Sequence, residues 1–111
     1  FLVLSGLALL AGLPFARAMD DADVARVIED FRLAAERAVE LGFDAVEIHL
    51  GHGYLLSQFL SPATNRRNDR WGGTPERRRA LPLAVLERVR RAVGRDRAVL
   101  AKTNLADGFR G

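Results

Sequence analysis

Residues 43–62 read Phe-Asp-Ala-Val-Glu-Ile-His-Leu-Gly-His-Gly-Tyr-Leu-Leu-Ser-Gln-Phe-Leu-Ser-Pro, and this stretch decides the fold. Its first part, Ala45–Ile48, is short, contains β-branched residues and follows a tight turn, which is typical of a buried parallel strand. Gly51 and Gly53 then disfavour a regular helix start, because glycines allow tight backbone turns. We therefore predict a strand, a glycine-containing turn, and one or two helical turns over Tyr54–Leu60.

A helix is predicted immediately before this strand. It begins within Met19–Asp23, where Asp20 or Asp21 can cap the free amides and the acidic cluster suits the positive end of the helix dipole. Gly42 is expected to stop the helix. Apolar residues recur at the three- and four-residue spacing of one helix face. This predicted buried face comprises Val24, Val27, Ile28, Phe31, Ala34, Ala35 and Ala38.

A second helix and a second strand are predicted after a polar loop over residues 63–73. Thr74 is placed to cap the helix and Pro75 to occupy its first position. Pro82 either kinks this helix or marks its true beginning. Gly94 closes the helix, and a strand follows over Arg97–Asn104. The predicted buried face of the helix comprises Leu81, Val85, Leu86, Val89, Ala92 and Val93.

The order helix–strand–helix–strand indicates an α/β protein with parallel strands. In such folds active sites lie at the carboxyl ends of the strands. His49, His52, Tyr54 and Lys102 all fall at that edge. Glu47 lies within the predicted buried strand, where a carboxylate requires a partner or a polar interior. A parallel barrel with a polar centre would provide that interior.

Composition bounds the class of protein. The 111 residues allow one domain at most, and an apolar content of 49% with 28% charged residues is typical of a globular chain. The chain has no cysteine, which excludes disulfides and thiolate chemistry. A net charge of +3 reflects arginines gathered in Arg66–Arg79, for which a nucleic-acid surface is one interpretation. We favour a solvated loop and helix face, because Trp71 is the one aromatic residue among them.

The N-terminal residues 1–18 form an apolar segment that we treat separately from residues 19–111. Its run of thirteen residues is too short to span a bilayer, which needs roughly 20. Ala16-Arg17-Ala18 resembles a signal-peptide cleavage site, so a secreted protein is one alternative. The other is a stretch that belongs inside a larger fold.

These side chains allow four interpretations of the site. A metal site at His49 and His52 is disfavoured, because zinc sites normally have a third protein ligand. A serine nucleophile at Ser57 or Ser61 is disfavoured, because no Gly-x-Ser-x-Gly elbow is present. The third has the two imidazoles donate hydrogen bonds to a substrate oxygen and Tyr54 act as proton donor. Purely structural roles for these side chains are the fourth.

Two segments match a known family. Residues 49–62 read His-Leu-Gly-His-Gly-Tyr-Leu-Leu-Ser-Gln-Phe-Leu-Ser-Pro, and residues 65–76 read Asn-Arg-Arg-Asn-Asp-Arg-Trp-Gly-Gly-Thr-Pro-Glu. The sequence closely resembles the old yellow enzyme family, which comprises FMN-dependent NAD(P)H:flavin oxidoreductases and ene-reductases. The match runs from about Arg17 to Gly111. One departure is Arg77, where the family pattern usually has asparagine.

The resemblance implies a fold and a set of roles. The fold would be an eight-stranded (β/α) barrel, of which this chain supplies the central part: about two parallel strands with flanking helices. His49 and His52 would bind the substrate carbonyl above the flavin, and Tyr54 would protonate the substrate. Lys102 would lie against the N1/O2 edge of FMN, where its charge stabilises the reduced, anionic flavin.

The expected activity is reduction of activated C=C bonds in small enone or enoyl compounds, with FMN and NAD(P)H as cofactors. By the resemblance we expect a cytoplasmic enzyme, with no nucleic-acid or membrane partner and with a homo-oligomer as an open alternative. We expect the 111-residue chain to be inactive by itself, because two strands cannot close a barrel around a flavin. The rival hypothesis is a non-catalytic α/β piece that needs a partner chain.

Overall fold

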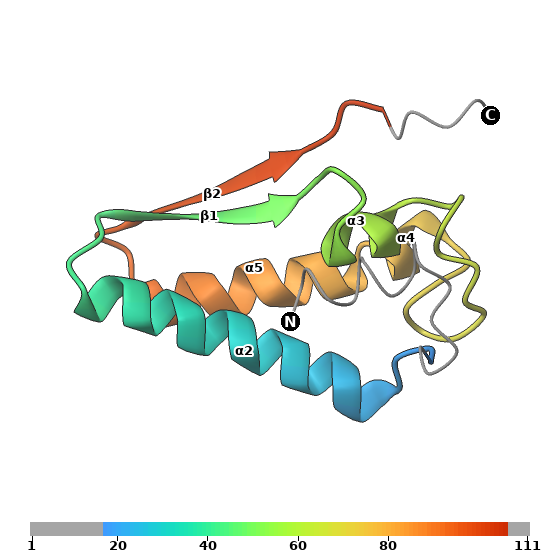
Figure 1. The fold of residues 1–111 in the computed structure, drawn as a ribbon, viewed down its shortest axis with the longest axis horizontal. Helices are drawn as coiled ribbons and strands as arrows, with labels where there is room; N and C mark the ends of the chain where they lie inside the picture. Colours follow the sequence, from blue (N-terminus) through green and yellow to red (C-terminus); the bar gives the residue numbers. More distant parts are fainter. Residues whose placement is uncertain (1–16, 107–111) are drawn as a thin grey trace.

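The computed structural model describes residues 17–106, so the predicted N-terminal segment lies outside the described residues except for Arg17 and Ala18. A two-stranded parallel sheet is covered on one face by two long helices, α2 and α5 (Figure 1). The predicted order of elements is confirmed. The elements are α2 (Asp21–Glu40), β1 (Ala45–Leu50), α3 (Leu55–Leu60), α4 (Pro75–Arg78), α5 (Ala80–Val93) and β2 (Ala98–Thr103).

Helix α2 is fixed at both ends by local hydrogen bonds. Asp20 is the cap: its carboxylate accepts the Asp23 N–H at 2.9 Å, while the Asp23 carboxylate accepts the Asp20 N–H at 3.0 Å. This reciprocal capping box satisfies two amides that the helix leaves free. Gly42 stops the helix with a φ of 88°, as predicted. The N–H of Phe43 then reaches the Ala38 carbonyl at 3.0 Å, which closes the last turn.

The predicted apolar face of α2 is confirmed with one exception. Val24 and Ala35 are buried, and Val27, Ile28, Phe31 and Ala38 are half-buried. Ala34 is exposed, so its predicted burial is wrong in the described residues. Its position lies at the margin of the apolar stripe, beside a shallow groove between α2 and β1.

The sheet has two chemically different faces. The sequence predicted that this strand ends at Ile48, whereas β1 continues to Leu50. Because side chains alternate along a strand, Ile48 and Leu50 face the helices and are buried. Glu47 and His49 belong to the opposite face. Glu47 is exposed, so the expected burial of this carboxylate is wrong here: within residues 17–106 the sheet is covered on one face only.

The second helical region is divided into α4 and α5 at Arg79. The Thr74 hydroxyl accepts the Arg77 N–H at 3.3 Å, and Pro75 is the first residue of α4, both as predicted. Pro82 is the third residue of α5, where the backbone lacks an intrahelical partner in any case. Pro82 therefore marks a helix beginning and does not kink α5. Gly94 ends α5 with a φ of 76°.

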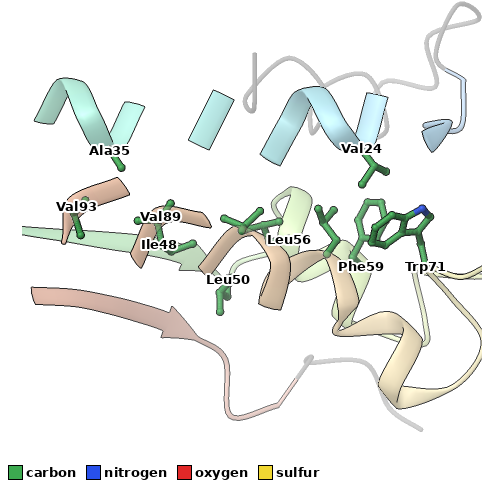
Figure 2. Close-up of a cluster of buried hydrophobic side chains, with 11 residues drawn as sticks. Val24, Ala35, Ile48, Leu50, Leu56, Phe59, Trp71, Val89 and Val93 are labelled. Carbon is green, nitrogen blue, oxygen red and sulfur yellow. The ribbon is translucent and has the colours of Figure 1, made fainter. Parts of the chain in front are cut away.

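One apolar core joins all these elements. Leu56, Leu81, Val85 and Val89 have no exposed side-chain surface. Figure 2 shows that the cluster runs from the N-terminal part of α2 to the C-terminal end of α5. The buried residues are Val24, Ala35, Ile48, Leu50, Leu56, Phe59, Trp71, Leu81, Val85, Val89 and Val93.

We expect Leu81→Ala to lower the free energy of unfolding by about 3 kcal/mol, because it removes a fully buried side chain and leaves a cavity. Leu83, two positions away on α5, is 53% exposed and is the matched control. Leu83→Ala should cost less than about 1 kcal/mol. Urea denaturation of each variant measures both changes. Equal losses at the two positions would contradict this assignment of the core.

Candidate active site

The turn after β1 places two of the predicted site residues. His52 has a φ of 58°, in the left-handed region that residues other than glycine rarely adopt. Gly53 follows with a φ of 74°. The Tyr54 N–H donates to the Gly51 carbonyl at 3.3 Å, which closes the turn. Tyr54 is the N-cap residue of α3, and its backbone carbonyl accepts the Gln58 N–H at 2.8 Å.

Three predicted site residues lie together. The ring centroids of His49 and His52 are 5.0 Å apart, and those of His49 and Tyr54 are 5.3 Å apart. His49 is half-buried, His52 is exposed, and Tyr54 is 42% exposed. Two imidazoles and a phenol therefore lie close together at the end of β1, and two of the three side chains are exposed.

Lys102 lies beside this group across the sheet. It is the register partner of His49 in the parallel pairing of β1 with β2. Register partners of neighbouring strands point to the same face, so Lys102 and His49 share the face away from the helices. Lys102 is exposed. The structure thus brings His49, His52 and Tyr54 together at the end of β1 and places Lys102 on the same sheet face as His49.

Sequence reasoning missed Asn104, the first residue after β2. Its side-chain oxygen accepts the His52 N–H at 3.2 Å. The signal that could have found it is its position directly after the end of β2, two residues beyond Lys102. Asn104 also borders a cavity of about 260 Å³. The lining residues are His52, Gly53, Ser57, Gln58, Ser61, Thr64 and Asn104.

The two serines considered as nucleophiles are held in backbone contacts. The Ser57 hydroxyl accepts the Gly53 N–H at 3.4 Å, and the Ser61 hydroxyl accepts the Ala63 N–H at 3.2 Å. Both residues are buried. They support the turn and the end of α3, which agrees with the sequence-based discount of serine chemistry.

The loop over residues 63–73 is packed around one buried amide. The Asn65 side chain donates to the Phe59 and Trp71 carbonyls, both at 2.7 Å. Gly72 fits against this centre because it has no Cβ; one built there would lie 2.5 Å from the Arg67 Cβ. The loop therefore carries its own packing and attaches to the end of α3.

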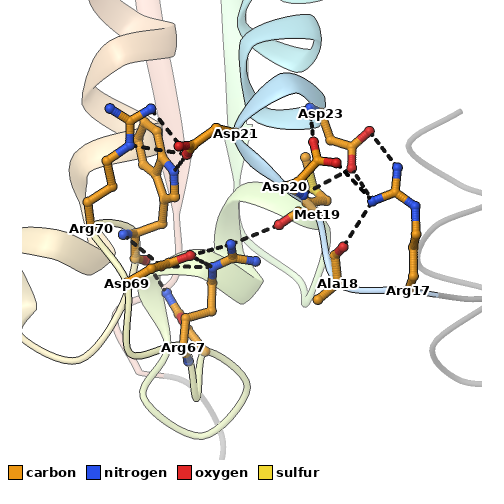
Figure 3. A network of polar contacts seen from close by, with 11 residues as sticks. Arg17, Ala18, Met19, Asp20, Asp21, Asp23, Arg67, Asp69 and Arg70 are labelled. Atoms are coloured by element: carbon orange, nitrogen blue, oxygen red, sulfur yellow. Dashed lines mark hydrogen bonds and ion pairs between the residues drawn. The ribbon is translucent and has the colours of Figure 1, made fainter.

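Arginines of this loop pair with the start of α2 (Figure 3). The Trp71 indole N–H donates to the Asp21 carboxylate at 2.7 Å, and Arg70 donates to the same oxygen at 3.1 Å while its guanidinium stacks over the Trp71 ring at 4.6 Å. Arg67 binds the Asp69 carboxylate and donates to the Met19 carbonyl at 2.8 Å. Arg67 and Arg70 are therefore engaged in intramolecular contacts, beyond the solvated loop that the sequence suggested.

Neither a metal cluster nor a membrane-spanning helix is found in the described part of the chain. Within residues 17–106 no three histidine and carboxylate side chains lie close enough to hold a metal ion. In the same part of the chain no helix has both the length and the apolar character needed to cross a membrane.

Three carboxylates around the start of α2, those of Asp21, Asp23 and Asp69, have pKa values below the ordinary value of an aspartate. A hydrogen bond from the Arg17 guanidinium, with help from the Asp20 amide, lowers the pKa of Asp23 to about 2. The Trp71 indole lowers the pKa of Asp21, and the Arg67 guanidinium lowers the pKa of Asp69. All three groups favour the folded state when they are charged.

We therefore expect acid to destabilise the chain between about pH 4 and pH 2. An unfolded aspartate titrates near pH 4, so the stabilisation is fully present above that pH and is lost as the pH falls through the lower folded pKa values. Asp23→Asn should flatten the fall in stability between pH 4 and pH 2. Exposed Asp30→Asn is the control. Thermal unfolding at a series of pH values tests this, and an unchanged slope in Asp23→Asn would contradict it.

Comparison with known proteins identifies what this chain is similar to. The family model described as "NADH:flavin oxidoreductase / NADH oxidase family" matches residues 9–109. The 4,4'-dithiodibutanoate disulfide reductase of Rhodococcus erythropolis is 51% identical over 87 residues, which cover 78% of this chain and 22% of that protein. The probable NADH-dependent flavin oxidoreductase YqiG of Bacillus subtilis is 49% identical over 81 residues, or 73% of this chain and 22% of that protein.

Solved structures agree with these relatives. Morphinone reductase in complex with tetrahydroNAD is 40% identical with a TM-score of 0.71, covering 77% of this chain and 24% of that chain. The old yellow enzyme homologue from Zymomonas mobilis is 39% identical with a TM-score of 0.72, covering 78% and 24%. The chain thus spans less than a quarter of the length of these relatives. The predicted fold class, a partial (β/α) barrel with two parallel strands, is confirmed.

Proposed function

From the premise that this chain belongs to the NADH:flavin oxidoreductase / NADH oxidase family, we propose that it forms the substrate-binding edge of an ene-reductase. The reaction would reduce activated C=C bonds of small carbonyl compounds. The observation that carries this proposal is the grouping of His49, His52 and Tyr54, with ring centroids 5.0 and 5.3 Å apart at the carboxyl end of β1. A reductase of similar fold, 32% identical with a TM-score of 0.75, is described in complex with 2-naphthoyl-CoA, which supports an activated acyl substrate.

Each of the three side chains has a chemical task in this proposal. The N–H groups of His49 and His52 would donate hydrogen bonds to the carbonyl oxygen and draw electron density from the alkene. The Tyr54 hydroxyl would give a proton to the alpha carbon. The beta carbon would receive a hydride and the alpha carbon that proton, so that the C=C bond becomes a single bond, the carbonyl group is kept and NAD(P)H becomes NAD(P)⁺.

The cofactors of this proposal are FMN and NAD(P)H. FMN, when bound, would supply the hydride, and the residues present suit it at one point. Lys102 places an exposed ammonium group on the same face as His49, where it can bind an electron-rich edge of the flavin. Lysine acts there as a point charge, whereas arginine would offer a planar fork.

The test of the roles needs a complete flavin site. We define the segment-exchanged enzyme as morphinone reductase in which residues 17–106 of this chain replace the matching segment. In that enzyme we expect His49→Ala plus His52→Ala to lower kcat/KM for cyclohex-2-enone about 1,000-fold, the scale of a lost oxyanion hole. Arg77→Ala, an exposed change outside the site, is the control. Unchanged turnover in the double variant would rule out the carbonyl-binding role.

A second substrate class is supported by the relative from Rhodococcus erythropolis, which is named as a disulfide reductase. Reduction of a disulfide to two thiols releases thiolates, which leave without help from a positioned acid. We expect Tyr54→Phe in the segment-exchanged enzyme to slow cyclohex-2-enone reduction about 100-fold, because it removes the proton donor. Reduction of 4,4'-dithiodibutanoate should change less than about threefold on the same argument. Loss of disulfide reduction with intact enone reduction would reverse the assignment of Tyr54.

We further propose that the 111-residue chain does not retain FMN by itself. Two strands cannot enclose a flavin, and the exposed sheet face and edges invite pairing with another chain. After incubation with FMN and desalting, the chain should be colourless, and its visible absorbance spectrum should have no flavin band. A retained flavin band would contradict this, and its elution volume would show whether a homo-oligomer has rebuilt the site. A colourless chain that binds another protein supports the non-catalytic alternative.

A further inference from the structure

We propose that Asn104 is a positioning residue that sets the geometry of the His49–His52 pair. The inference rests on the proposed function, since it concerns the two imidazoles that would bind the substrate carbonyl. The turn after β1 has an unusual backbone and contacts the residue that follows β2.

The position of the second imidazole depends on an unfavourable backbone conformation. His49 lies within β1, whose pairing with β2 fixes its direction. His52 lies in the turn and has a φ of 58°. Residues with a side chain avoid this region because their Cβ crowds the following carbonyl oxygen. A relaxed His52 would take a negative φ, and its ring would move away from that of His49.

Asn104 opposes this relaxation through a hydrogen bond. Its side-chain oxygen accepts the His52 N–H at 3.2 Å, across 52 positions of the sequence. The bond joins the turn to the strand that carries Lys102, two residues earlier. This bond therefore fixes the position of His52, which would bind the substrate oxygen, relative to β2, which carries Lys102.

Gly51 makes room for this contact. A Cβ built on Gly51 would lie 2.8 Å from the Asn104 side-chain oxygen and 3.6 Å from its Cγ. The asparagine therefore occupies the space that a side chain at position 51 would fill. Gly51 is buried, so a side chain at position 51 would have to displace the Asn104 side chain. Gly51 thus leaves room for the Asn104 side chain, whose oxygen accepts the N–H of the following residue, His52.

The remaining bonds of the turn lie within its own segment. The Tyr54 N–H reaches the Gly51 carbonyl, and the Gly53 N–H reaches the Ser57 hydroxyl at 3.4 Å. These bonds shape the start of α3 but do not relate the turn to β2. Pairing of β1 with β2 reaches only Leu50 and Thr103, so the bond from the His52 N–H to Asn104 is what we expect to hold the two ring centroids 5.0 Å apart.

The test uses NMR of the complete 111-residue chain, with no cofactor or turnover required. In Asn104→Ala we expect the His52 amide to exchange with solvent about fivefold faster, the ratio set by one hydrogen bond of ordinary net strength. The nuclear Overhauser contact between the His49 and His52 rings should weaken. Amides of α5 should keep their protection, which separates repositioning from unfolding.

Two further variants make the result specific. Asn104→Asp keeps an oxygen acceptor and should restore both the protection of the His52 amide and the ring contact. Exposed Asn68→Ala is the matched control and should change neither. Unchanged His52 signals in Asn104→Ala, or failure of Asn104→Asp to restore them, overturns the inference. Such a failure leaves the proposed reaction standing, because enone reduction is measured separately; loss of the proposed reaction would leave this geometry intact.

Discussion

The parallel pairing of β1 with β2 is the constraint on which the rest of the structure depends. Its register sets His49 opposite Lys102 and Leu50 opposite Thr103. Because side chains alternate, the same register turns the apolar residues of β1 toward α2 and α5 and leaves the charged and proton-handling residues on the other face. A shift of one residue would reverse the two sets and bury His49 among the helices. The site therefore follows from the packing of the core.

The loop over residues 63–73 contacts both the end of α3 and the first turn of α2. Asn65 ties the loop to the end of α3, and Trp71 ties it to the first turn of α2 through Asp21. Helix α3 begins at the residue after Tyr54, so fixing its far end also limits the movement of that phenol. Arg67 and Arg70 supply guanidinium groups to a backbone carbonyl, to the carboxylates of Asp69 and Asp21, and to the Trp71 indole face. These contacts hold the two arginines within the chain.

Local signals in the sequence predicted most of the elements, and longer-range contacts account for what it missed. Gly42 and Gly94 ended helices as expected, since the left-handed conformation is a property of one residue. Ala34 and Glu47 were misjudged because burial depends on which elements cover a face, and spacing cannot report that. Asn104 was missed for the same reason: its partner lies 52 positions away. The proximity of His49, His52, Tyr54 and Lys102 could be predicted because strand ends are visible in sequence and meet at one edge.

The central claim is that the face of the sheet carrying His49 and Lys102 is the flavin face, and the midpoint potential of bound FMN tests it most directly. In the segment-exchanged enzyme, Lys102→Met should make the flavin harder to reduce by about 30 mV or more, equivalent to about 1.4 kcal/mol for two electrons. Lys102→Arg should keep the potential, because the charge remains, and exposed Arg77→Met should leave it unchanged. An unaltered potential in Lys102→Met would contradict the account, because Lys102 would then lie away from the cofactor.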